Sequence, residues 1–115
     1  MVLPANFNAL IEQAIRQDLY KKLIQQLNKD FLYASIDLEL DDGILPKDLK
    51  STLHETLYRL IQEKFADYLN LLYIIDVSER KVKQLDGSDL LKLSEAVAFL
   101  ILQREWQKVC YRSLY

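Results

Sequence analysis

An acidic stretch between residues 37 and 48 is the part of this sequence that comes nearest to a metal-binding motif. Asp37, Glu39, Asp41 and Asp48 occupy the positions that the first, third, fifth and twelfth oxygen ligands take in an EF-hand calcium loop. The sixth position is Asp42 instead of the glycine that the sharp bend requires, and the twelfth is Asp instead of a bidentate Glu. We therefore interpret the stretch as a solvated acidic connection, and the sequence predicts no metal or other cofactor.

His54 is the single histidine of the chain and the first candidate for acid–base chemistry. His54 and Glu55 begin a His-Glu-x-x-His zinc motif, but Tyr58 stands where the second histidine is needed. We interpret His54 as a hydrogen-bonded structural residue at the edge of an apolar helix face. The sequence contains no recognisable catalytic motif, which leaves enzymatic activity an open question.

Lys64 is a charged residue in an apolar context. Helical spacing places it on the same predicted face as Leu60 and Tyr68. In one interpretation its aliphatic stem packs against the helix and its ammonium group reaches water. In the other, Lys64 is embedded and forms a buried ion pair with Asp18 or Glu105. The second interpretation would also allow a small-ligand pocket or an active site between helices.

A charged ridge is predicted near the end of the chain, where Arg104, Lys108 and Arg112 follow one another at four-residue steps. Such a ridge could bind phosphates or an acidic protein surface, but it also complements the negative end of a helix dipole. Nucleic-acid-binding domains are usually more basic than a chain with a pI near 5.4. Because residues 31 to 48 are strongly acidic, we expect the ridge to be balanced within the fold, with nucleic-acid binding as an alternative.

Composition indicates one helical domain that covers residues 1–115. Half of the residues are hydrophobic and 28% are charged, and there are two glycines and two prolines, which argues against disorder and against a turn-rich β-sandwich. Cys110 is the single cysteine, so no internal disulfide can form, which suits a reducing compartment. The N-terminus lacks a basic signal region and no apolar run is long enough to span a membrane. These features predict a cytoplasmic protein with no membrane contact.

Apolar periodicity predicts an all-α bundle of three long helices at about residues 6–28, 47–74 and 88–113. A short helical element at 30–36 is allowed. The segment 29–45 is ambiguous, because residues 35–40 alternate polar and apolar side chains as a strand does, although no comparable second strand is present. We favour a helical turn followed by an extended connection that tucks Ile36, Leu38 and Leu40 under the bundle.

The predicted helix 88–113 organises this fold, because residues 96–102 are apolar without interruption. A helix that is apolar all round must be covered all round, and two neighbouring helices leave part of it uncovered. A homodimer would provide the missing cover, and Phe99, Leu102, Trp106 and Tyr111 are the predicted interface residues.

These patterns favour a non-catalytic helical protein-interaction or scaffold module that self-associates through its third long helix. Two alternatives belong to other classes. One is a small-ligand-binding domain or enzyme with a pocket between helices at Lys64, and the other is a nucleic-acid accessory protein that uses the basic ridge.

Overall fold

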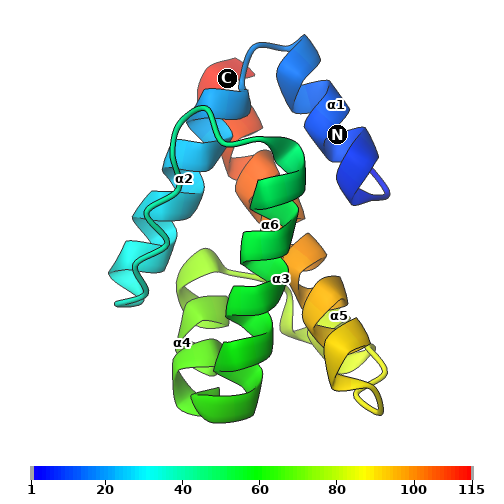
Figure 1. The fold of residues 1–115 in the computed structure, drawn as a ribbon. Helices are drawn as coiled ribbons and strands as arrows, with labels where there is room; N and C mark the ends of the chain where they lie inside the picture. The colour runs from blue at the N-terminus through cyan, green and yellow to red at the C-terminus, as the bar shows by residue number, and fades with distance from the viewer. Residues whose placement is uncertain (1, 115) are drawn as a thin grey trace.

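The computed structural model describes residues 2–114, and over these residues the chain is helical with no β-strand. The prediction of an all-α fold is confirmed, but the number of helices differs from the prediction (Figure 1). Six helices are present in the described residues: α1 (Phe7–Arg16), α2 (Tyr20–Tyr33), α3 (Pro46–Glu63), α4 (Phe65–Ile75), α5 (Glu79–Lys83) and α6 (Leu90–Leu114). None of them is long and apolar enough to cross a bilayer.

Helix α6 lies at the centre of the fold and is the predicted third long helix, with nearly the predicted bounds. It packs against α1, α2, α3 and α4. Leu102 and Trp106 are fully buried, as are Val97 and Ile101. The continuous apolar run is therefore covered within one chain, because four helices, rather than two, surround it.

The predicted helix 6–28 is interrupted, and its two parts are α1 and α2. Asp18 adopts a left-handed conformation with φ of 57°, which ends α1, and the chain resumes as α2 after Leu19. Asn6 caps α1 by accepting a hydrogen bond from the Ala9 N–H at 2.9 Å. Figure 1 shows that α2 turns away from α1 at this point. The sequence contains no glycine or proline at the break. The apolar periodicity continues across it, and the prediction therefore joined α1 and α2 into one helix.

The predicted helix 47–74 is also two helices. Lys64 leaves the helical conformation, with φ of −139° and ψ of 62°, and separates α3 from α4. The chain then reverses direction, so that α4 lies beside the later part of α3 (Figure 1). Because of this reversal, the apolar residues after Lys64 lie on different sides of the fold from those predicted for one continuous helix.

The segment between α2 and α3 forms an extended connection, as favoured above. Helix α2 runs on to Tyr33, so the predicted short element at 30–36 is its last turn. Leu40 is buried, and Ile36 and Leu38 are partly buried against the core. Asn28 fixes the connection, because its side-chain amide exchanges two hydrogen bonds of 2.9 Å with the backbone of Leu40.

The charged connector at residues 76–87 contains one short helix that the sequence did not predict. Ser78 caps this helix, α5, by accepting a hydrogen bond from the Lys81 N–H. The connector ends where Asp89 accepts a hydrogen bond from the Lys92 N–H at 3.1 Å. Asp89 therefore caps the start of α6.

Candidate functional site

Helix α4 exposes an apolar face, which we call the α4 stripe and define as Phe65, Leu69 and Tyr73. Their four-residue spacing places them on one side of the helix, and their exposed fractions are 55%, 51% and 83%. The opposite side of α4 packs into the core through Tyr68, Leu71 and Ile75, which are buried. Contiguous exposed apolar side chains of this size are typical of interaction surfaces.

A groove adjoins the α4 stripe on the side of α5. Its volume is about 570 Å³, and its lining residues are Leu69, Leu72, Tyr73, Asp76, Val77, Ser78, Glu79, Val82 and Lys83. Glu79 and Lys83 form an ion pair of 3.6 Å on α5. The lining of the groove therefore includes five apolar or aromatic side chains, and two of its charged residues, Glu79 and Lys83, neutralise each other.

The predicted interface residues on α6 occupy different environments. Leu102 and Trp106 have no exposed surface, Phe99 is partly buried, and Tyr111 is exposed. Leu102 and Trp106 belong to the core of a single chain, because the helix pairs that replace the two predicted long helices cover them. Phe99 and Tyr111 are the members of the predicted interface that keep exposed surface.

The residues of the predicted basic ridge are largely engaged within the chain. Arg104 forms an ion pair of 3.2 Å with Asp76 and also donates a hydrogen bond to the Asp76 carbonyl. Lys108 points into the protein, and Arg112 donates a hydrogen bond to the side chain of Gln26. Internal balance was expected, but the acidic partners are Asp30, Asp76 and Glu105 rather than the carboxylates of residues 37–48.

A buried polar cluster lies between α2 and α6. Lys108 Nζ is 2.8 Å from Asp30 Oδ2 and 3.3 Å from Glu105 Oε1. Gln26 donates a further hydrogen bond of 3.0 Å to Asp30. Glu105 has no exposed surface, and its contact with Lys108 lacks hydrogen-bond geometry, so neither carboxyl oxygen has a hydrogen-bond partner.

The two carboxyl groups of this cluster are shifted in opposite directions. Burial, and then the neighbouring Asp30 carboxylate, raise the pKa of Glu105 to about 9. Burial also opposes ionisation of Asp30, but the neighbouring Glu105, Lys108 and Gln26 side chains outweigh it and lower the pKa of Asp30. At neutral pH the cluster thus holds one carboxylate, one neutral carboxyl group and one ammonium group.

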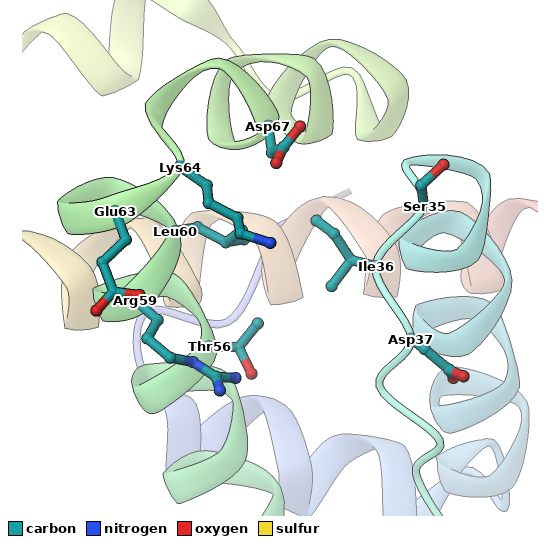
Figure 2. A pocket seen from close by; sticks show the side chains of 9 residues that line it. All are labelled: Ser35, Ile36, Asp37, Thr56, Arg59, Leu60, Glu63, Lys64 and Asp67. Carbon is teal, nitrogen blue, oxygen red and sulfur yellow. The ribbon is translucent and has the colours of Figure 1, made fainter.

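Lys64 is not embedded in an apolar face, because the helix breaks at this residue. Its side chain is exposed, and it forms an ion pair with neither Asp18 nor Glu105 in the described residues. It instead projects into a pocket of about 400 Å³ between α3, α4 and the connection that follows α2 (Figure 2). The residues that line this pocket are Ser35, Ile36, Asp37, Thr56, Arg59, Leu60, Glu63, Lys64 and Asp67.

His54 takes no part in these sites, and of the acidic stretch only Asp37 does, as a residue that lines the pocket around Lys64. Burial lowers the pKa of His54, which is partly buried on α3. Asp37, Glu39 and Asp48 are exposed, while Asp41 accepts a hydrogen bond of 3.0 Å from the Gly43 N–H. Within residues 2–114, no three His, Cys, Asp or Glu side chains are grouped as metal ligands.

Comparison with known protein families, curated proteins and solved structures found no match to this chain. The features that sequence reasoning missed are the α4 stripe, the Asp30 and Glu105 pair, and the Thr56 hydroxyl. A signal for Glu105 exists, because it lies at helical spacing between Leu102 and Val109, both of which are buried. No comparable signal marks the α4 stripe, which depends on the break at Lys64.

We expect Glu105→Gln to remove a pH dependence of stability. The folded protein holds a proton on Glu105 up to a pKa of about 9, whereas the unfolded chain releases it near 4.5. The contribution of Glu105 to the free energy of unfolding is fully present below pH 4.5. It decreases by about 1.4 kcal/mol per pH unit as the pH rises from 4.5 toward 9. Urea unfolding between pH 5.5 and 8 should show that the wild type loses stability relative to the variant.

Glu12→Gln, an exposed substitution on α1, is the control and should keep the wild-type pH dependence. His54 contributes with the opposite sign, because its lowered pKa makes it lose stability as the pH falls below its unfolded value of 6.5. This contribution is present in both proteins and cancels in their difference. Parallel curves for wild type and Glu105→Gln would show that Glu105 is ionised in the folded state.

Proposed function

We propose that this protein is a non-catalytic helical interaction module that self-associates through the α4 stripe. The observation that carries the proposal is the exposure of three large apolar side chains on a helix whose other side is firmly packed. Phe65 also contacts Tyr68, with ring centroids 5.4 Å apart, so one end of the stripe rests on a buried residue. Aromatic residues held in this way are enriched at protein interfaces.

A second copy of the chain suits the stripe because the stripe is self-complementary. Two α4 helices packed in antiparallel fashion about a twofold axis would place Leu69 opposite its equivalent. Phe65 of one copy would then lie beside Tyr73 of the other, next to the groove between α4 and α5. Apolar surface on each copy would thus be covered by the same surface of its mate.

The charges on and around the α4 stripe are compatible with a twofold dimer. A residue at the twofold axis, such as Leu69, lies near its own equivalent, so a charge at that position would be repelled. Ala66 and Asn70, which flank the stripe, are uncharged. The nearest charged pair on α5, Glu79 and Lys83, is already balanced.

This proposal keeps the self-association expected from the sequence but moves it from α6 to α4. It also favours protein over nucleic acid as the partner, because Arg104 and Lys108 are engaged by carboxylates. A cytoplasmic location belongs to the same proposal, since the single cysteine, Cys110, is buried and free.

We expect light scattering over a concentration series to show a dimer for the wild type and a folded monomer for Leu69→Glu. The charge would be placed at the symmetry axis, where it faces its equivalent. Leu91→Glu is a matched control, because Leu91 is a leucine of similar exposure, 55%, on α6. Circular dichroism should show the same helical content for all three proteins.

A mixture of Leu69→Glu with Leu69→Lys tests the twofold geometry. Each variant alone should be monomeric, whereas the mixture should form a heterodimer in which the opposite charges meet. A wild type that stays monomeric at every concentration contradicts the proposal. Equal loss of the dimer in Leu69→Glu and Leu91→Glu would move the interface away from α4.

A further inference from the structure

The pocket around Lys64 carries charged side chains of both signs that do not neutralise one another. Arg59 and Lys64 are the cations, and Asp37, Glu63 and Asp67 are the carboxylates. None of the five forms an ion pair within the described part of the chain. In Figure 2, Lys64 extends between Asp67, which lies on the α4 side, and Arg59, which lies toward the middle of α3.

Thr56 is the second observation that points to a ligand. It is only 7% exposed, yet its side chain lines the pocket and is directed into it (Figure 2). Its hydroxyl makes no hydrogen bond to another group among residues 2–114. The hydroxyl is the polar end of an otherwise buried side chain, so it offers the pocket a hydrogen-bond donor and acceptor that a bound polar group would use.

We propose that this pocket binds a small zwitterion of the α-amino acid class. Lys64 and Arg59 would receive its carboxylate, to which the Thr56 hydroxyl would donate a hydrogen bond. Asp67 would receive its ammonium group. Ile36 and Leu60 form the apolar part of the pocket and would contact its side chain.

A dipolar ligand fits better than a ligand with one charge. A simple anion would meet the pocket's carboxylates, and a simple cation would meet Arg59 and Lys64. The volume of about 400 Å³ falls within the range of small-molecule pockets. The pocket contains no residue of the α4 stripe, so this inference stands independently of self-association.

The test is a titration of the isotopically labelled protein with each of the twenty common amino acids, followed by amide chemical shifts. At least one amino acid should cause saturable shifts at the residues around the pocket. The two probes that lack one charge, namely the amine and the carboxylic acid with the same side chain, should bind at least about tenfold more weakly. Shifts that do not saturate up to about 10 mM for all twenty would overturn the proposal.

Two variants connect the binding to the pocket. Thr56→Val preserves shape and removes only the hydroxyl, and Lys64→Gln removes one charge at an exposed position, so neither should disturb folding. Each should weaken binding about tenfold. Arg80→Gln, an exposed cation on α5 outside the pocket, should bind as the wild type does. Unchanged affinity in both pocket variants, or a carboxylic acid that binds as tightly as the amino acid, would refute the assignment.

Discussion

The Leu102→Glu variant is expected to lose the cooperative thermal unfolding transition of the wild type. Leu102 has no exposed surface and belongs to the core that α6 shares with its neighbours. The substitution removes apolar contacts and forces a carboxylate into a site without a partner. The expected loss exceeds about 5 kcal/mol, which is comparable with the whole stability of a small domain. Circular dichroism during heating measures the effect.

Leu91→Glu provides the comparison on the same helix, because its leucine is exposed. This variant should retain the wild-type transition to within a few degrees. If Leu102→Glu instead gave a folded monomer from a wild-type dimer, α6 would be the interface and the buried environment of Leu102 would be wrong. The two substitutions thus distinguish a core helix from an interface helix.

The Lys108→Met variant should lose about 3 kcal/mol of unfolding free energy. Lys108 is the cation that balances the buried Asp30 carboxylate at 2.8 Å, and the side chains of Lys108 and Asp30 are 18% and 9% exposed. Removing one partner of a buried pair leaves the other charge uncompensated, which costs much more than an exposed pair contributes. Urea unfolding at pH 7 measures the loss.

Two further variants show whether this loss of unfolding free energy comes from the buried ion pair. Lys92→Met removes an exposed lysine from α6 and should change stability by less than about 0.5 kcal/mol. Adding Asp30→Asn to Lys108→Met should recover part of the loss, because no uncompensated charge then remains. A loss near zero in Lys108→Met would show that the ammonium group reaches water and that the buried cluster is not an ion pair.

The apolar core was largely predictable from the sequence. The continuous run at residues 96–102 identified α6 as the helix that must be covered on all sides, and Val97, Ala98, Ile101 and Leu102 are buried. Ile36, Leu38 and Leu40 also lie against the bundle as expected. These predictions succeed because burial of apolar side chains is the main driving force of folding and leaves a periodic trace in the sequence.

The chain reversals were not predictable in the same way. Asp18 and Lys64 end helices without a glycine or proline, and periodicity continues across both positions. At such sites the packing of the following helix overrides local propensity. The error at Lys64 changed the expected site most, because it hid the α4 stripe and placed the lysine on a continuous apolar helix face instead of at a helix break beside a pocket.

The residues of the basic ridge show why a binding site cannot be predicted from sequence spacing alone. Arg104, Lys108 and Arg112 lie on one side of a helix, as their spacing requires, yet different elements engage them. Arg104 pairs with Asp76 at the end of α4, whereas α2 engages Lys108 and Arg112. Sequence spacing fixes the side of a helix on which a residue lies, but it does not fix which neighbour covers that side. Glu105 could be singled out as a possible ion-pair partner, but its pairing with Lys108 and Asp30 needed the packing of α2 on α6.

The most direct test of the proposed self-association is a cross-link through Leu69→Cys. If Leu69 lies at the twofold axis, mild oxidation should convert the variant into a covalent dimer, because facing helices bring the two cysteines within disulfide reach. The native Cys110 is buried and should not react, and Glu12→Cys, at an exposed position on α1, controls for random collisions. Rapid dimer formation by Leu69→Cys alone is the predicted result. Equal, slow cross-linking of both variants would contradict an interface formed by α4.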